Sequence, residues 1–267
     1  MPFDIPFQVK RLSRDVFAKL DFEVMKHAFA CHHDLGLLCD EKIYQADLAA
    51  RLLQAGFDTQ REARVLVRHK DFVKEYIFDL LVINGAIYEL KAVSAIVPDH
   101  DTQLMNYLFI ADIKHGKIIN FRPASVQSRF VNNAVSHEEQ RRFAADTNRW
   151  KRLTDRCDSV QDVMQALCTD WGTFLESRLY RDALTHFLGG AQTVIQPVTL
   201  KRGSILLGQQ SFHLLSKNVA FQITTASARQ HLINAQLQRL LNLTPLQAIQ
   251  WINLSRHTLQ FATITRS

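Results

Sequence analysis

Asp79, Glu89 and Lys91 are the residues whose types and spacing could do chemistry in this sequence. Glu89 and Lys91 are two positions apart in an apolar run, so in a strand their side chains would lie on one face. Two carboxylates beside an ammonium make a hard, oxygen-rich site for Mg²⁺ or Mn²⁺. The lysine would then orient a water nucleophile or stabilise charge on a phosphoryl group. Glu41 is a candidate for a third carboxylate.

A second pair of polar residues, Gln103 and Tyr107, has i,i+4 spacing and would share one helix face. That face could meet a phosphate or a base. The alternative interpretation is a polar contact on the helix and a half-buried core tyrosine. A lone Glu-x-Lys on a strand usually marks a solvated salt bridge, so the prediction rests on the ordered set of residues.

These residues fall on predicted elements in the order helix, helix, three strands, helix, strand. Ser13 is expected to cap the first helix and Gly36 to end it, and the second helix runs over about 40–54. Strands are predicted over 64–69, 76–83, 86–93 and 117–121, and the last helix over 99–111. This order indicates a compact mixed α/β unit.

Whether Asp79 shares a face with Glu89 and Lys91 depends on the loop between their strands. A two-residue turn, Asn84-Gly85, would place Asp79 on the opposite face and split the site. A three-residue loop over 84–86 would pair Asp79 with Lys91 and restore the site, with Gly85 or the residue after it in a bulge. We predict this irregular loop.

The second half of the chain repeats the order of the first. Residues 136–188 are expected to be helical, and strands, a helix and a strand follow them. A shift of 133 positions carries residues 84–121 onto 217–254, with slightly larger offsets upstream, which indicates a duplication. The alternative is that two strand-rich segments align by pattern alone. In the second copy His213, Gln222 and Thr224 would replace the three charged residues, so no carboxylate would remain to hold a hard cation.

Charge distinguishes the C-terminal part of the chain. The formal net charge is +6, and residues 183–267 contain no Asp or Glu. Such a segment could neutralise the phosphates of a nucleic acid, although a mildly basic, Gln-rich surface is the alternative. The candidate phosphate-binding residues are Lys201, Arg202, Lys217, Arg229 and Arg239.

Other features exclude several classes of protein. No apolar run is long enough for a membrane span and no secretory signal is evident, so the sequence predicts a cytoplasmic protein without a membrane partner. Four cysteines without a C-x-x-C pair predict reduced, buried thiols. The absence of phosphate-binding and dinucleotide-binding glycine motifs argues against a nucleotide cofactor.

The ordered set of residues resembles the PD-(D/E)XK nuclease superfamily. The resemblance consists of Phe78-Asp79, then Glu89-Leu90-Lys91, then the Gln-x-x-x-Tyr element of Gln103 and Tyr107, with Glu41 upstream. The Gln-x-x-x-Tyr element is similar to that of RecB-like nucleases. Residues 24–130 more closely resemble the bacterial GxxExxY family, because Glu41 and Tyr44 keep the E-x-x-Y part, although Leu38 stands at the glycine position.

This resemblance implies a restriction-endonuclease-like α/β fold with a mixed-sheet core, and the 133-position repeat predicts a degenerate second copy of it. The nuclease domain would span 1–135, and a helical connector with a degenerate, basic nuclease-like domain would span 136–267. Mg²⁺ or Mn²⁺ would be held by Asp79, Glu89 and the carbonyl of Leu90, with Glu41 as an accessory acid. Lys91 would be the catalytic lysine, and Gln103 and Tyr107 would line the substrate path.

The implied function is metal-dependent hydrolysis of phosphodiester bonds in DNA, with an analogy that favours single strands or ends. The alternative is a catalytically inactive nucleic-acid-binding protein that retains the site as a relic. The sequence leaves open DNA or RNA, strandedness, and internal or terminal cleavage. It also leaves open whether the chain is a monomeric pseudo-dimer or a homodimer.

Overall fold

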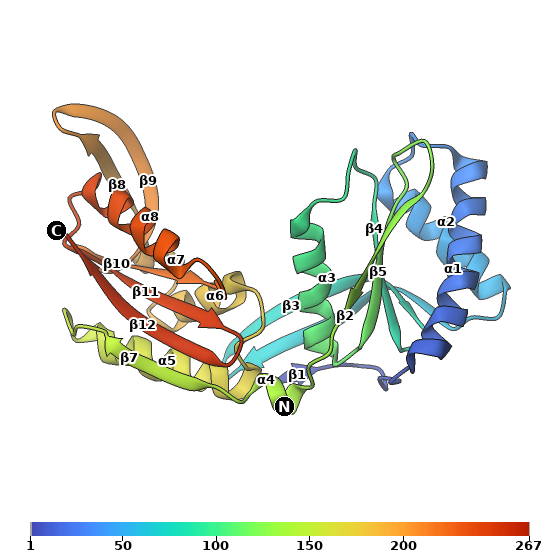
Figure 1. The fold of residues 1–267 in the computed structure, drawn as a ribbon, viewed down its shortest axis with the longest axis horizontal. Coiled ribbons are helices and arrows are strands. Elements are labelled where there is room, and N and C mark those ends of the chain that lie inside the picture. Colours follow the sequence, from blue (N-terminus) through green and yellow to red (C-terminus); the bar gives the residue numbers. More distant parts are fainter. Residues whose placement is uncertain (1, 267) are drawn as a thin grey trace. The chain divides into compact units, whose positions relative to one another are not determined.

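The computed structural model describes residues 2–266, which divide into two compact units at the junction of Ser136 and His137 (Figure 1). No helix in this part of the chain has the length and apolar character that a membrane span needs. Each unit contains one six-stranded sheet.

The first unit is a mixed sheet with helices on both faces (Figure 1). Its elements are β1 (Phe3–Asp4), α1 (Arg14–Leu35), α2 (Glu41–Gln54), β2 (Thr59–His69), β3 (Phe72–Val82), β4 (Ala86–Lys91), α3 (Pro98–Ala111), β5 (His115–Asn120) and β6 (Gln127–Asn132). The strands lie in sequence order, β1-β2-β3-β4-β5-β6. Neighbours are antiparallel except β4 and β5, which are parallel because α3 connects them.

The predicted limits of the first helix are confirmed. The Ser13 hydroxyl accepts a hydrogen bond from Val16 N at 3.3 Å, which satisfies a backbone donor in the first turn. Gly36 ends α1 with φ of 68°, in the region that favours glycine. The Tyr44 hydroxyl donates to the Gly36 carbonyl at 2.7 Å and its ring stacks on Phe121 at 4.6 Å, so Tyr44 ties α1, α2 and the sheet together.

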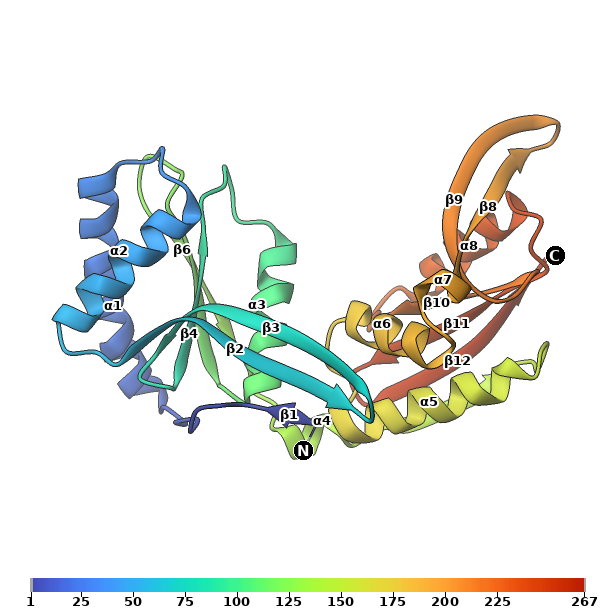
Figure 2. The same ribbon diagram turned by 180° about the vertical axis from the view of Figure 1, so that it is seen from behind.

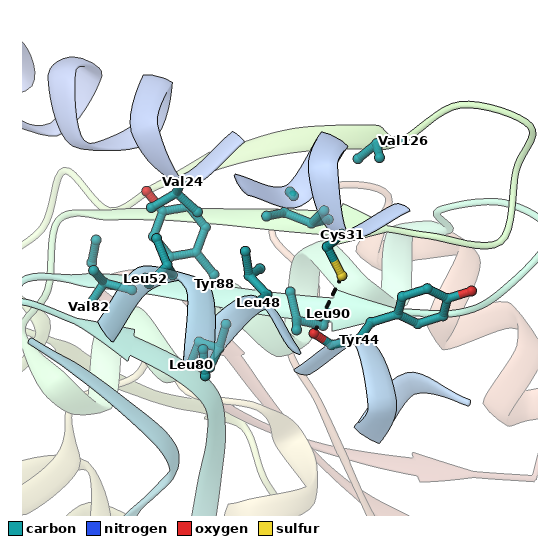
Figure 3. Packing of buried hydrophobic residues seen from close by; sticks show 14 of the residues in the cluster. Val24, Cys31, Tyr44, Leu48, Leu52, Leu80, Val82, Tyr88, Leu90 and Val126 are labelled. Carbon is teal, nitrogen blue, oxygen red and sulfur yellow. Dashed lines mark hydrogen bonds between the residues drawn. The ribbon is translucent and has the colours of Figure 1, made fainter. Parts of the chain in front are cut away.

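The main core of this unit lies between α1, α2 and one face of the sheet (Figure 3). Leu80 and Val82 of β3 and Tyr88 and Leu90 of β4 are fully buried against the two helices. Side chains alternate along a strand, so Glu89 lies on the opposite face, which α3 covers (Figure 1).

The loop between β3 and β4 has the predicted length of three residues but starts one position earlier than predicted. Val82 pairs with Ala86, so the loop is 83–85. Ile83 and Asn84 adopt φ of 46° and 54°. Ala86 pairs with Val82 without a register shift in the ladder, so the prediction of a bulge at Gly85 or Ala86 is wrong. The new register brings Asp79 next to Glu89 instead of Lys91, and the parity of the faces is unchanged.

The second unit contains a sheet of the order β7-β12-β11-β10-β9-β8. Its elements are α4 (His137–Gln140), β7 (Ala144–Arg149), α5 (Arg156–Trp171), α6 (Ser177–Phe187), α7 (Ala191–Val194), β8 (Ile195–Arg202), β9 (Ile205–Ser216), β10 (Val219–Thr224), α8 (Gln230–Asn242), β11 (Ala248–Ser255) and β12 (Thr258–Thr265). The prediction that 136–188 is helical is wrong at β7, whose polar residues lack the apolar alternation of a half-buried strand.

The two sheets share a stretch of identical register. The β4–β5 pairs run from Ala86↔His115 to Lys91↔Asn120, and a shift of 133 positions carries them onto the β10–β11 pairs from Val219↔Ala248 to Thr224↔Asn253. The same shift carries the β5–β6 pairs onto β11–β12.

Two polar contacts also recur in both units. Asn120 bonds both the N–H and the carbonyl of Val93 through its side chain, and Asn253 does the same with Ala226. Tyr180 donates to the carbonyl of Gly172 at 2.7 Å, as Tyr44 does to Gly36.

The close approach of the N-terminal segment to the β3–β4 loop predicts an effect of Gly85→Ala. Lys10 N donates to Asn84 O at 2.8 Å, and a Cβ at Gly85 would lie 2.7 Å from both Leu12 Cγ and Lys10 O. We expect the overpacked variant to lose about 1–3 kcal/mol of unfolding free energy in urea titrations.

A control variant identifies the cause of this loss. Leu12→Ala in the Gly85→Ala background removes one of the two clashing groups, so the double variant should be more stable than the sum of the single losses predicts. Additive losses would contradict a direct clash with Leu12.

Candidate active site

The candidate site lies where β3 separates from β4. The ladder between the two strands contains only three pairs and ends at Leu80↔Tyr88. Beyond that pair β3 continues with β2 as a long curved hairpin, while β4 stays paired with β5 along its whole length (Figure 2). Asp79 and Glu89 are the first residues past the last pair, one on each strand.

Asp79 and Glu89 are held by contacts from β4 and α2. Asp79 Oδ2 accepts a hydrogen bond from Leu90 N at 2.8 Å, and the Asp79 carbonyl accepts one from Gln45 Nε2 at 2.7 Å. Glu89 Oε1 is 2.6 Å from Lys91 Nζ. The structure therefore brings together the three charged residues that the sequence singles out.

Burial and like charge perturb both carboxyl groups. Burial raises the pKa of Glu89 to about 8, with the charge of Asp79 adding to the shift and Lys91 opposing it. Burial also raises the pKa of Asp79, although the hydrogen bond from Leu90 N opposes that shift. For Lys91, burial disfavours the charged form, but the carboxylates of Glu89, Glu41 and Asp79 together outweigh it and the pKa is raised.

The side chains fit a divalent cation that is bound by few protein ligands. Glu89 is 2% exposed, and its Oε2 atom is buried with no hydrogen-bond partner among the described residues. An orphaned carboxylate oxygen beside a second carboxylate is the donor set that Mg²⁺ prefers. Within residues 2–266 no group of three or more His, Cys, Asp or Glu side chains could hold a metal.

The N-terminal turn of α2 is close to the two carboxylates. Glu41, its first residue, is half-buried, and its charge raises the pKa of both Asp79 and Glu89. Gln45, which bonds the Asp79 backbone, was missed by the sequence analysis, although its i,i+4 spacing from Glu41 could have indicated it. Glu62 was also missed; its charge too raises the pKa of Asp79, and it pairs with Lys42 at 3.1 Å.

Gln103 and Tyr107 contact each other on α3. Gln103 Nε2 donates to the Tyr107 hydroxyl at 2.9 Å. The Tyr107 ring packs against Phe78, the residue before Asp79, with ring centroids 4.9 Å apart, and is 8% exposed. This pair is therefore anchored beside the strand that carries Asp79.

The corresponding place in the second unit lacks carboxylates. Gln222 and Thr224 occupy the ladder positions of Glu89 and Lys91, as the sequence predicts. The counterpart of Asp79 differs from the prediction, because a bulge shifts the β9–β10 register and His213 pairs with Phe221. His213 therefore corresponds to Leu80, and buried Phe212 takes the Asp79 position.

An aromatic side chain also contacts this place in the second unit. Trp251 Nε1 donates to the Thr224 hydroxyl at 2.9 Å. Apolar and neutral groups thus replace the charged site of the first unit.

All five predicted phosphate-binding residues are exposed. Lys201 and Arg202 end β8, Lys217 lies in the turn between β9 and β10, and Arg229 and Arg239 lie at the two ends of α8. They are therefore spread over several elements of the second unit.

Comparison with known proteins places the first unit in a family. Residues 18–131 match the model of the PD-(D/E)XK nuclease superfamily. These residues form a PD-(D/E)XK nuclease superfamily domain. The six residues singled out as catalytic candidates all lie within this PD-(D/E)XK domain.

The comparisons with solved structures and with curated proteins found a distant likeness and no match, respectively. A solved structure, titled "Crystal structure of SSO0001", is 16% identical to the chain with a TM-score of 0.30. The alignment covers 45% of this chain and 63% of that one, so the chain spans less than two thirds of that protein. No curated protein matches the chain.

The raised pKa of Glu89 predicts a stability change with pH in the absence of metal. The folded protein keeps the Glu89 proton until about pH 8, whereas an unperturbed carboxyl releases it near 4.5. The folded state binds more protons in this window, so its stability falls as pH rises. Glu89→Gln removes this ionisation, and we expect the variant to gain on the parent by up to about 1.4 kcal/mol per pH unit between pH 5 and pH 8.

Urea unfolding in EDTA across this pH range measures the effect. Glu75→Gln, at an exposed position of β3, is the matched control and should follow the parent. If Glu89→Gln also ran parallel to the parent at every pH, the buried carboxyl would not be perturbed as described.

Proposed function

We propose that the first unit is a divalent-metal-dependent nuclease whose active site contains Asp79, Glu89 and Lys91. The observation that carries the proposal is the buried, partnerless Glu89 Oε2 beside Asp79 at the strand fork. Membership of this domain in the PD-(D/E)XK superfamily implies a nucleic-acid substrate. We infer that the substrate is DNA, with single strands or ends preferred by analogy with the Gln-x-x-x-Tyr element.

In this proposal Asp79, Glu89 and the Leu90 carbonyl hold Mg²⁺ or Mn²⁺, with Glu41 nearby as an accessory acid. The bound ion would supply charge neutralisation at the scissile phosphate and a water of lowered pKa. Glu89 would give up its proton when the cation binds, because a metal ligand must be deprotonated. Asp79 is already oriented by the hydrogen bond from Leu90 N.

Lys91 is proposed to orient the attacking water and to stabilise negative charge on the phosphoryl oxygens. Its ammonium is held by Glu89 at 2.6 Å, and the side chain is 12% exposed. The nearby carboxylates of Glu89, Glu41 and Asp79 raise the pKa of Lys91 despite its burial, which favours the charged ammonium. Gln103 and Tyr107 are proposed to line the substrate path along α3.

We further propose that residues 1–135 are the nuclease domain and that 136–267 are a helical connector with a degenerate, basic copy of it. The shared register of β4–β5–β6 and β10–β11–β12 supports a duplication. The paired contacts of Asn120 with Asn253 and of Tyr44 with Tyr180 support it too. The finer assignment to the GxxExxY family is supported by Glu41 and by the structural role of Tyr44.

An inactive, purely nucleic-acid-binding protein is less well supported. Burying two carboxylates side by side costs stability, so a site without function is expected to lose them. The second unit has the substitutions expected of such a loss, with Phe212, Gln222 and Thr224 at the charged positions.

A cleavage assay with end-labelled single- and double-stranded DNA and RNA tests the proposal. We expect cleavage with Mg²⁺ or Mn²⁺, none in EDTA, and a loss of at least about 100-fold in Asp79→Ala and Lys91→Ala, because each removes a group that stabilises the transition state.

Gln222→Ala alters the Glu89 counterpart in the second unit and serves as the matched control, which should keep parental activity. Intact substrate under every metal condition would contradict the proposal, as would equal activity of the parent and both active-site variants.

A further inference from the structure

A two-stranded ribbon of the second unit extends beyond its sheet. β9 pairs with β10 only between His213 and Ser216, whereas the residues of β9 from Ile205 onward pair with β8. The outer half of the β8–β9 hairpin therefore has no third strand and projects past the sheet (Figure 1). Every residue from 201 to 211 is exposed.

The ribbon has a defined shape at its outer end. Arg202 pairs with Ile205, so a two-residue turn closes the hairpin, and Gly203 supplies the positive φ of 61° that such a turn requires. Lys201 N donates to the carbonyl of Leu243 at 2.7 Å, which fastens the ribbon next to the C-terminal end of α8. Arg239 lies one helical turn before Leu243 and is exposed.

Apolar and basic side chains face each other across this outer end. Ile205, Leu206 and Leu207 are 53%, 65% and 49% exposed. Lys201 pairs with Leu206 and Arg202 with Ile205, so each basic residue lies beside an apolar one. Three exposed aliphatic residues in succession on a strand are typical of an interaction surface.

We propose that the outer part of the β8–β9 hairpin, residues 201–207, is an arm that binds duplex nucleic acid. Lys201 and Arg202 contact backbone phosphates, with Arg239 beside them, and the aliphatic residues enter a groove and pack against the bases. This inference rests on the proposed function, because it takes nucleic acid as the substrate. It adds that the second unit binds the duplex part of that substrate.

Charge and size favour this ligand. The arm belongs to a segment, 183–267, without any acidic residue, so no carboxylate there repels a polyanion. The major groove admits a two-stranded ribbon, and apolar side chains can contact the thymine methyl groups there. A lipid surface fits less well, because the polar Gly203-Ser204 turn is at the tip and would have to enter the bilayer first.

Fluorescence-anisotropy titrations of the full chain in EDTA, with labelled 20-base-pair duplex and single-stranded DNA over a range of salt, test the arm without cleavage. For Lys201→Ala/Arg202→Ala we expect about 10-fold weaker duplex binding at moderate salt and a log–log salt slope reduced by about 1.8, the effect of two lost phosphate contacts. For Ile205→Ser/Leu206→Ser we expect about 5-fold weaker duplex binding with an unchanged salt slope, because apolar contacts release no counterions.

Matched controls remove the same groups elsewhere in the second unit. Lys151→Ala/Arg156→Ala removes two exposed positive charges from the segment before α8, and Leu232→Ser removes an exposed leucine of α8. The duplex affinity of both controls should be closer to that of the parent than to that of the arm variants. Circular dichroism and thermal unfolding establish that each variant is folded.

Several outcomes would overturn the arm. Both arm variants could bind duplex as tightly as the parent, or the control variants could lose as much affinity as the arm variants. The parent could also fail to bind duplex at all. Arm substitutions that instead abolish binding to anionic vesicles or a self-association of the chain would assign the ribbon to lipid or to a second copy.

Binding in EDTA is independent of the active site. If the protein binds duplex through the arm but never cleaves it, the nuclease proposal is refuted and the proposed role of the arm is supported. If the parent cleaves with metal but the arm variants bind duplex as tightly as the parent, the nuclease proposal stands and the arm proposal is refuted.

Discussion

The site depends on the separation of β3 from β4 immediately after Leu80 and Tyr88. A regular ladder would hold Asp79 and Glu89 in a continuous sheet, whereas the fork leaves Leu90 N available to Asp79 and gives the side chain of Gln45 access to the Asp79 carbonyl. Two carboxylates are thereby fixed next to one another under burial that raises the pKa of both. The fold keeps this unfavourable arrangement because the core on the other face of β3 and β4 is fully packed.

Much of the first unit could be predicted from its sequence because its signals are local. Ser13, Gly36 and the apolar periodicity between them define α1, and the two-residue spacing of Glu89 and Lys91 places them on one face. The register of the β3–β4 loop could not be predicted to the residue. Ile83 and Asn84 take positive φ, whereas an Asn84-Gly85 turn would have positive φ at Asn84 and Gly85. The close approach of Leu12 and Lys10 to Gly85 is a contact between distant segments, which the local turn signal does not contain.

Contacts between distant segments were beyond sequence reasoning. Gln45 and Glu62 join the surroundings of Asp79 only through the tertiary arrangement of α2 and β2. β7 is polar, and it is a strand only because β12 offers it a parallel edge. The counterpart of Asp79 moved from His213 to Phe212 because a bulge in β9 changes the register, which no constant sequence offset can reveal.

The two units carry different residues at the positions that correspond to the fork between β3 and β4. The first keeps charge at the fork at a cost in stability, and the second places Phe212 and a hydrogen bond between Trp251 and Thr224 there. Under the proposals made above, the first unit performs the chemistry, and the segment 183–267 of the second unit, which has no Asp or Glu, binds a polyanion.

The central claim is that the fork binds a divalent cation by displacing the proton of Glu89. Isothermal titration of Mn²⁺ into metal-free protein at pH 7, repeated in buffers of different ionisation enthalpy, counts the protons released on binding. The account predicts saturable binding with about one proton released per ion, and loss of that binding in Asp79→Asn. The absence of saturable binding, or binding that releases no proton and survives in Asp79→Asn, would contradict it.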